Sequence, residues 1–560
     1  MPARLTLRVL LALTSLVCLA LTLEATGAGR DQRPKPAAAQ RIDQEYTARI
    51  RQYSEDPRIL TELVDHMPAS DRVPSPLQVL GRIPGTPDEL TYYGDILRYF
   101  QALDRASERV TLVTIGTSDE GREMVMAIVA DEATIRSLDK YKAITARLSD
   151  PRALGAEEAR QLIAAGKPIY YITGSLHSTE CGSPEMLMEL AFRLAVEETP
   201  FIQTIRSNVI VAITPVLEVD GRDKQVDTFY YGKRTGKPVP PPTYWGRYVA
   251  HDNNRDAIGQ GLTLTQHVMR TFLDWHPTVL HDLHESMPYL YIWTGTNPLN
   301  RSIDPLVIEE WWLLGKYETS EMTKRGVPGV WTGGATYGGW APNFLIFIAN
   351  THNAIGRIYE TQKYGPTPYE VNLSPAELSR EWYRPTPPMA RIKWGPRSNV
   401  NIQQSALLLG LQFVARNREL FLENYYIKNR RAIERGQSEA PFAYVIPAAQ
   451  RRRGEAADLV NLLRRQGVEV HRANAASTVG RANIAAGDYV VRMDQPYRAV
   501  VDALLGVQYY PAGNPIPFDD TGWSLPLLRD VTATPVEDKG ILASPMTLMS
   551  ADAPIVGSIT

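Results

Sequence analysis

Apolar and polar residues alternate along most of the chain with two periods, one typical of strands and one typical of helices. Short runs rich in β-branched and apolar residues alternate with longer stretches that carry an apolar stripe. This alternation predicts an α/β fold, with a mixed central sheet flanked by helices. We expect strands at 110–116, 123–130, 167–175, 208–216, 278–284 and 354–361, and helices at 183–198, 262–275, 305–326 and about 405–426.

The length of 560 residues exceeds one ordinary core and predicts several domains. We expect a signal peptide at 1–28, a leader with short helices at 29–85, and a catalytic domain at 86–435. Residues 440–560 should form a smaller α/β domain, flavodoxin-like or related, because "PFAYVIPAAQRRRGEAADLVNLLRRQGVEVHRA" has the order strand, helix, strand. This region contains no Gly-rich phosphate loop, so we expect no nucleotide site there. It is either a binding module or a packing partner of the catalytic domain.

The N-terminus has the order of a secretory signal peptide. Arg4 and Arg8 precede an apolar stretch, and the small residues 25–28 follow it. A retained membrane anchor is the alternative, because the apolar stretch approaches spanning length. After cleavage Cys181 is the one cysteine left, which excludes an internal disulfide. Export without disulfides favours a secreted or periplasmic protein, with no membrane association after cleavage.

Composition narrows the class of partner. The chain is 44% hydrophobic and 22% charged, with a formal net charge of -2. Such a balance is typical of a soluble globular protein and gives no indication of nucleic-acid binding, which favours a strongly basic face. The sequence does not indicate an oligomeric state.

Three polar residues lie where buried strands are expected to end. His177 and Glu180 follow the strand at 167–175, and His284 ends the strand at 278–284. Ligands at the carboxyl ends of strands can converge, and three protein ligands leave a fourth position for water, as in catalytic zinc sites. Taken alone, the His177–Glu180 spacing favours a hydrogen-bonded turn over a metal site. His281 competes as a ligand, but it should face the opposite side of its strand, as a core histidine.

Several motifs in one order resemble the zinc carboxypeptidase family, the metallocarboxypeptidases of the carboxypeptidase A and B type. They extend over about residues 86–429. His284 follows His177 by 107 positions and Glu360 follows His284 by 76, close to the family's intervals. The motifs are "IGTSDEGRE", "HSTE", "PVLEVDGRD", "HDNNRD", "DLHES" and "RIYETQ".

This resemblance implies the chemistry of the site. His177, Glu180 and His284 would bind one Zn²⁺ per chain, and Glu360 would be the general base. A cation beside the metal would stabilise the oxyanion. Arg234 is the candidate for this cation, with Lys233 and the more remote Arg247 as alternatives.

The resemblance also implies how a peptide binds. Asn254 and Arg255 would hold the terminal carboxylate of the substrate, since a guanidinium suits that group. Asp252 would orient His177 from behind. Tyr337, next to Gly338 and Gly339, would cover the bound substrate.

Some residues depart from the family pattern. Thr179 stands where the family often has arginine, and Glu285 and Ser286 replace a serine and an aromatic residue. We expect Glu285 and Ser286 to alter the pocket near the substrate backbone, not the metal or the base. The leading hypothesis is a secreted zinc peptidase that hydrolyses C-terminal peptide bonds. The alternatives are a zinc amidase or peptidase acting on cell-wall peptides, and a non-catalytic binding relative.

Overall fold

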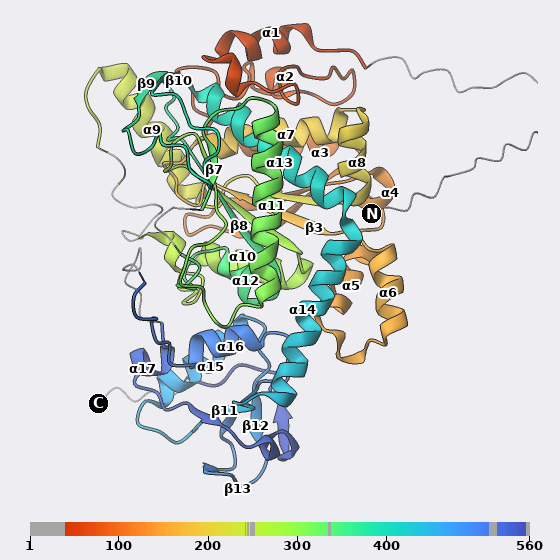
Figure 1. The fold of residues 1–560 in the computed structure, drawn as a ribbon, viewed down its shortest axis with the longest axis vertical. Coiled ribbons are helices and arrows are strands. Elements are labelled where there is room, and N and C mark those ends of the chain that lie inside the picture. Colours follow the sequence, from red (N-terminus) through yellow and green to blue (C-terminus); the bar gives the residue numbers. More distant parts are fainter. Residues whose placement is uncertain are drawn as a thin grey trace, which may run out of the picture. The chain divides into compact units, whose positions relative to one another are not determined.

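A mixed sheet forms the centre of the larger part of the molecule (Figure 1). Over the residues that the structure describes, its eight strands have the order β1-β2-β4-β3-β5-β8-β6-β7. The strands from β4 to β8 in this order are parallel, whereas β1, β2 and the β6–β8 pair bring antiparallel pairing. The strands are β1 (Val110–Thr117), β2 (Glu123–Val129), β3 (Ile169–Gly174), β4 (Ile210–Thr214), β5 (Val279–His284), β6 (Leu290–Ile292), β7 (Val330–Thr332) and β8 (Ile355–Thr361).

Helices cover both faces of this sheet, so the predicted fold class is confirmed. Figure 1 shows α7 and α13 on one side of β3 and β8, and α10 and α12 on the other. The helices of this part are α3 (Tyr93–Ala106), α4 (Glu132–Ile135), α5 (Leu138–Ser149), α6 (Ala156–Ala165), α7 (Gly182–Val196), α8 (Pro200–Asn208), α9 (Val219–Thr235), α10 (Thr263–Trp275), α11 (Pro305–Lys324), α12 (Phe347–Thr351), α13 (Pro396–Arg416) and α14 (Arg418–Ser438).

The core explains why the central strands have nearly continuous apolar sequences. Every residue of β3 and β5 is buried, as expected for parallel strands covered on both faces. The N-terminal segment adds to the same core through Tyr46 and Ile50 of α1 (Gln44–Tyr53). The shorter elements are η1 (Pro57–Ile59), α2 (Pro76–Leu80), η2 (Pro151–Ala153), η3 (Asn253–Arg255) and the hairpin of β9 (Tyr369–Asn372) with β10 (Arg391–Trp394).

Two segments differ from the expected secondary structure. The helix expected at about 405–426 is in fact two helices, α13 and α14, which meet at Asn417. Apolar residues continue at helical spacing across that junction, so the periodicity does not show the break. We predicted no helix directly after β4, but this segment forms α9, with Glu218 as its N-cap.

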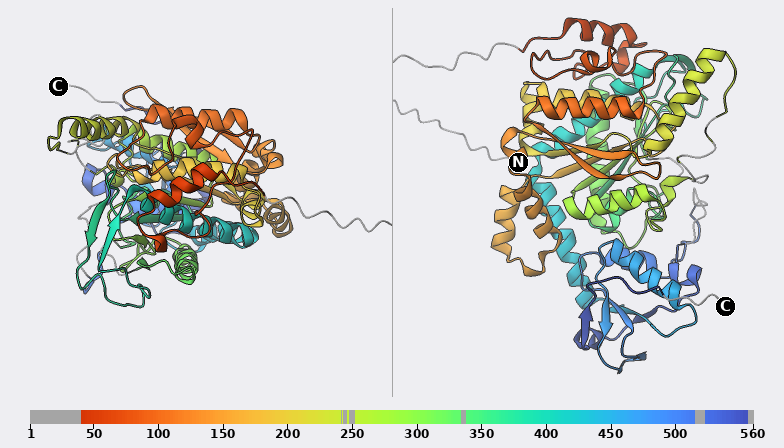
Figure 2. Two further views of the ribbon diagram at one scale, coloured as in Figure 1. Left: turned by 90° about the horizontal axis from the view of Figure 1, so that it is seen from above. Right: turned by 180° about the vertical axis from the view of Figure 1, so that it is seen from behind.

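The C-terminal region (residues 440–560) has a sheet of its own, with the order β16-β11-β15-β12-β17 in its described part (Figure 2). The sheet is antiparallel, because β15 lies between β11 and β12 and pairs with both in the opposite direction. The region is α/β as expected, but its antiparallel sheet is not that of a flavodoxin-like domain, whose strands are mostly parallel. The elements are β11 (Ala443–Ile446), α15 (Arg453–Arg465), β12 (His471–Ala473), β13 (Ser477–Val479), β14 (Ala482–Ile484), β15 (Tyr489–Arg492), α16 (Arg498–Leu505), α17 (Leu525–Arg529), β16 (Thr534–Val536), η4 (Lys539–Ala543) and β17 (Met546–Leu548).

The computed structural model describes residues 40–240, 242, 246, 252–333, 338–514 and 523–555. The expected signal peptide therefore lies outside the described residues. From Gln40 onward the chain forms one unit, and the expected domain boundaries stay predictions. Within the described ranges, no helix combines the length and the apolar character that a membrane crossing requires.

Candidate metal centre

Three neighbouring parallel strands place polar side chains at one edge of the sheet. His284 is the last residue of β5, and Glu360 stands opposite it in β8. His177 and Glu180 lie in the loop between β3 and α7, where the Glu180 amide donates to the His177 carbonyl at 3.0 Å. Since parallel strands share the direction of their carboxyl ends, their terminal residues meet there.

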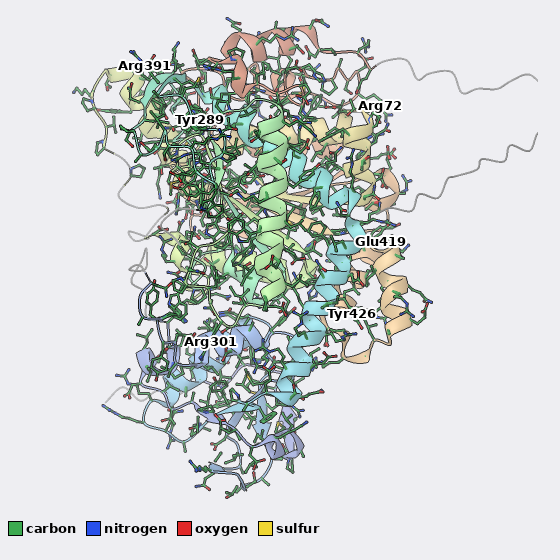
Figure 3. All side chains as sticks on the ribbon, in the orientation of Figure 1. Arg72, Tyr289, Arg301, Arg391, Glu419 and Tyr426 are labelled. Carbon is green, nitrogen blue, oxygen red and sulfur yellow. The ribbon has the colours of Figure 1, made fainter. Side chains whose placement is uncertain are left out.

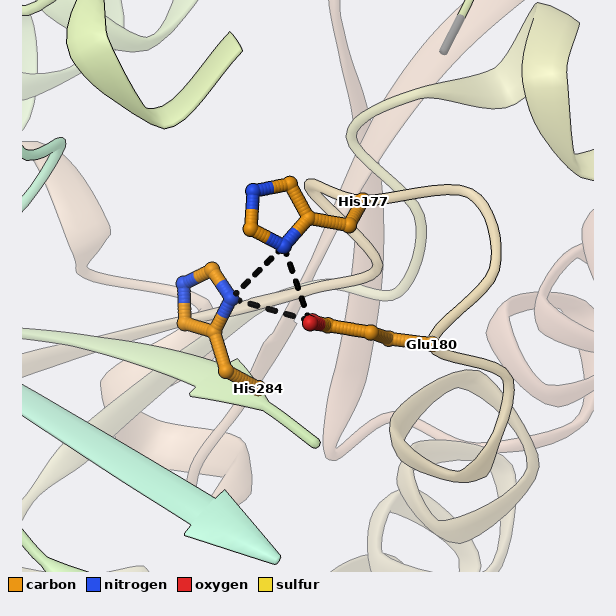
Figure 4. Close-up of side chains that lie close together, drawn as sticks. All are labelled: His177, Glu180 and His284. Atoms are coloured by element: carbon orange, nitrogen blue, oxygen red, sulfur yellow. Dashed lines mark hydrogen bonds and ion pairs between the residues drawn. The ribbon is translucent and has the colours of Figure 1, made fainter. Parts of the chain in front are cut away.

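The three predicted ligands form one cluster (Figure 4). Nδ1 of His177 lies 2.9 Å from Glu180 Oε1, Nδ1 of His284 lies 3.0 Å from Glu180 Oε2, and the two Nδ1 atoms are 3.3 Å apart. A tetrahedral ion with bonds of about 2.0–2.1 Å keeps its nitrogen ligands about 3.3 Å apart. The donor set and its spacing therefore fit a zinc ion.

The charges of the cluster strongly perturb its pKa values. Burial lowers the pKa of His177, but the carboxylates of Glu180 and Asp252 outweigh burial and raise it to about 9. Burial raises the pKa of Glu180, but the two histidines lower it to about 2. The pKa of His284 is likewise raised well above its usual value: burial lowers it, but Asp282 and Glu180 raise it by more. The carboxylates beside both imidazoles therefore favour a positive charge at this point. A divalent cation can supply that charge.

Asp252 holds His177 from the side opposite to the cluster, as the resemblance implied. Its Oδ1 lies 2.9 Å from His177 Nε2, and its Oδ2 lies 3.2 Å from Nη1 of Arg255. The guanidinium of Arg255 stacks over the ring of Phe344 at 4.3 Å. A single carboxylate thus joins Arg255 to a candidate metal ligand.

His284 has a carboxylate partner that the sequence reasoning missed. Nε2 of His284 lies 2.7 Å from Asp282 Oδ2, and Thr173 Oγ1 donates to Asp282 Oδ1 at 2.6 Å. Asp282 is fully buried. It stands two positions before His284 in β5, so both side chains leave the same face of the strand. The spacing of two residues within a predicted strand could have indicated the contact between Asp282 and His284.

The residues around Glu360 make it part of the same site. Glu360 is 8% exposed, and Ser286 Oγ donates to its Oε2 at 2.7 Å. Tyr291 of β6 stands opposite Glu360 on its other side, so a row of paired residues leads from His284 across Glu360 to Tyr291. We expected Ser286 at a substrate subsite; its hydroxyl contacts the candidate base instead.

Glu285 also differs from expectation. Its side chain accepts hydrogen bonds from the amides of Gly182, at 2.6 Å, and Tyr364, at 3.2 Å. Gly182 is the first residue of α7, where unpaired N–H groups and the helix dipole favour a carboxylate. Burial raises the pKa of Glu285 to about 8. Glu285 therefore connects the β5 end of the site to the helix that follows Glu180.

Asn254 lies close to the cluster, with both ends of its amide on protein atoms. Its Oδ1 accepts from the amide of Leu345 at 2.7 Å, and its Nδ2 lies 3.2 Å from His284 Nε2. The side chain is 5% exposed. The bond from Leu345 thus joins the segment that carries Arg255 to the residues before α12.

Arg234 does not reach the cluster, which corrects our expectation. It is exposed in the last turn of α9, whose first turn lies near His177 through the bond from Glu218 N to Ser175 O. At about 1.5 Å per residue, the helix carries Arg234 about 20 Å away from that turn. Lys233, in the same turn, is also exposed. Tyr337 and Arg247 lie outside the described residues.

His281 lies in the core, as expected. It is fully buried, and its Nδ1 lies 2.7 Å from the hydroxyl of Tyr170. Burial and the charge of Arg357 lower the pKa of His281 well below its usual value. A neutral imidazole in that position is a packing residue of the sheet.

Residues 96–243 match the zinc carboxypeptidase family model. The resemblance that the motifs indicated is thereby confirmed for the part of the chain that contains His177 and Glu180. The match ends before His284 and Glu360. No curated protein sequence matches the chain.

The solved structures that match this chain include metallocarboxypeptidases. A metallo-carboxypeptidase from Burkholderia cenocepacia has 15% sequence identity and a TM-score of 0.40, over 59% of this chain and 70% of that one. A metallo-carboxypeptidase from Pseudomonas aeruginosa, in complex with (2-guanidinoethylmercapto)succinic acid, has 12% identity and a TM-score of 0.40 over the same shares. Carboxypeptidase A from Helicoverpa armigera has 16% identity and a TM-score of 0.36, over 60% and 74%.

Proposed function

We propose that the protein is a secreted zinc-dependent peptidase that hydrolyses C-terminal peptide bonds. The family match supports a hydrolase of the zinc carboxypeptidase type. The observation that carries the proposal is the convergence of His177, Glu180 and His284, with ligand atoms within 4.8 Å of one another, beside Glu360 on the adjacent strand.

The chain's own residues divide the chemistry between them. A zinc ion held by the three ligands would polarise the scissile carbonyl and lower the pKa of a coordinated water to about 7. Glu360 takes the proton from the attacking water and passes it to the leaving amine. The hydroxyl of Ser286 binds Glu360 Oε2, which keeps the carboxylate of the base in one orientation.

Arg255 determines which peptide bond is cleaved. Its guanidinium is partly exposed beside the cluster and pairs with Asp252 through Nη1. The planar fork of a guanidinium suits a terminal carboxylate. Held there, a peptide would place its last amide bond at the ligands, which makes the enzyme an exopeptidase.

Two other functions use the same fold. An amidase or peptidase acting on cell-wall peptides would keep the three ligands and Glu360 and differ in the substrate. A non-catalytic binding relative would bind peptides without cleaving them. A panel of cell-wall peptides and linear peptides with free or blocked C-termini separates the first from our proposal, and turnover of any of them excludes the second.

The decisive experiment compares wild type with Glu360→Gln on a blocked dipeptide that has a free carboxylate and on a longer peptide. Bound zinc is quantified in both proteins. We expect about one zinc per chain in each. We expect cleavage by the wild type alone, because the amide of glutamine cannot accept the proton. Equal turnover by both proteins would remove Glu360 from the mechanism, and cleavage of peptides with a blocked C-terminus would contradict the role of Arg255.

A further inference from the structure

The segment that carries Arg255 depends for its position on a second irregular segment. Residues 252–258 form one turn of 3-10 helix and a turn after it, with no strand to fix them. They rest on residues 343–345, which precede α12. Three contacts join the two: Asn254 Oδ1 with Leu345 N at 2.7 Å, Ala257 N with Asn343 O at 3.2 Å, and the Arg255 guanidinium with the Phe344 ring at 4.3 Å.

The C-terminal region packs behind both segments. Trp523 is 5% exposed and contacts Trp340, with ring centroids 5.6 Å apart. Tyr510 contacts the same tryptophan edge-on at 5.4 Å. Ile258, three positions after Arg255, packs against this aromatic cluster. Two side chains of the C-terminal region therefore contact Trp340, three positions before the 343–345 segment, in a cluster that reaches Ile258.

Hydrogen bonds strengthen the same interface. Gln466, the C-cap of α15, donates from Nε2 to the carbonyl of Ile258 at 3.2 Å, and its own carbonyl lies 2.7 Å from His352 Nε2. Beside Arg301 (Figure 3), Ser302 Oγ donates to Asp502 Oδ2 at 2.7 Å.

Ala257 and Ile258 line one small cavity together with Leu504 of α16, so the two parts are in contact there. Packed protein interiors transmit strain, so a displacement of one part is felt by the other.

We propose that the C-terminal region is a positioning part of the site for the substrate carboxylate, with Trp523 and Gln466 as its positioning residues. The region acts through the 252–258 segment and does not touch the reacting atoms. This inference rests on the proposed function, because it assigns Arg255 to the terminal carboxylate. Of the two alternatives for this region, the inference favours the packing partner over the independent binding module.

The test compares Trp523→Ala with Ile541→Ala in the full-length protein. Ile541 is fully buried in the same region, but in a cluster that contains no residue outside it, so its truncation is a matched control. For a blocked dipeptide with a free carboxylate, we expect Trp523→Ala to raise KM about tenfold. We expect kcat and zinc content to stay within about twofold of wild type. Ile541→Ala should leave all three unchanged.

Hydrogen exchange gives a readout that does not depend on catalysis. The amide of Leu345 donates to Asn254 Oδ1, so its exchange rate reports whether the two segments stay together. We expect this rate to rise in Trp523→Ala and not in Ile541→Ala. Gln466→Ala, a milder change, should raise KM about threefold, which keeps the test valid if Trp523→Ala does not fold.

The outcomes are distinct. If Trp523→Ala and Gln466→Ala match Ile541→Ala in both KM and Leu345 exchange, the inference is overturned. If the wild type cleaves no peptide, the proposed function fails, and the exchange of Leu345 still decides whether the region supports the segment.

Discussion

The two histidines of the candidate metal centre are supported in different ways. On the strand side, defined as β5 with Asp282 and His284, the carboxylate is fully buried and bound by Thr173. On the loop side, defined as residues 175–181 with Asp252, the side chain of the carboxylate is 36% exposed and also paired with Arg255. The same histidine–carboxylate contact thus occurs in two dielectric environments, which makes its loss more costly on the strand side.

The largest expected effect is a difference in stability between the two histidine variants, because each variant leaves a carboxylate without its imidazole partner. His284→Ala and His177→Ala should both abolish zinc binding. In the metal-free proteins, His284→Ala should lower the free energy of unfolding by about 3–5 kcal/mol, because Asp282 is left buried and unpaired. His177→Ala should cost about 1–2 kcal/mol, because Asp252 retains Arg255 and solvent. Urea unfolding measures both.

A double variant checks the reason for that difference. His284→Ala combined with Asp282→Asn removes the orphan charge together with the histidine. It should recover part of the stability that His284→Ala alone loses. Equal losses from the two single variants, or no recovery in the double variant, would remove the contrast between the two sides.

The next effect concerns pH and the loop side. Burial raises the pKa of Glu218 to about 7, and its amide donates to Ser175 in the loop. A carboxyl whose folded pKa lies above its unfolded value of about 4.3 contributes stability at low pH, which is lost as pH rises towards 7. Relative to wild type, Glu218→Gln should therefore gain about 2 kcal/mol of unfolding free energy between about pH 5 and pH 8. A difference between the proteins that stays constant with pH would contradict this prediction.

The smallest effect compares the two carboxylates directly. Asp282→Asn should lower zinc affinity about 10- to 100-fold, the range found for partners that orient metal-bound histidines. Asp252→Asn should lower it less than about tenfold, because its carboxylate is partly hydrated. Competition with a chromophoric chelator measures both affinities. A larger loss from Asp252→Asn would reverse the order of the two sides.

The two sides also differ in how much of them the sequence predicted. His177, Glu180 and His284 each follow a strong strand pattern, and parallel strands end at a common edge, so their meeting was predictable. Asp252 came from the resemblance. Asp282 was missed although its spacing from His284 indicates a shared face.

The errors arose where local pattern is weak. The segment of Arg234 is polar and we predicted no helix there, whereas Glu218 caps a helix that carries Arg234 away. The strands β6 and β7 have three residues each, too few for a period to show. In the C-terminal region, strand, helix, strand was correct as an order, but pairing through β15 depends on residues far along the chain.

Gly182, at the start of α7, constrains how this protein can evolve. A Cβ there would lie 2.4 Å from Glu285 Oε1, so even alanine would push the carboxylate off the helix end. Substitution of Gly182 is therefore disfavoured for as long as Glu285 is kept. An alignment of descendants would show an invariant glycine two positions after the HSTE motif, and the invariance would record a steric limit, not contact with a peptide.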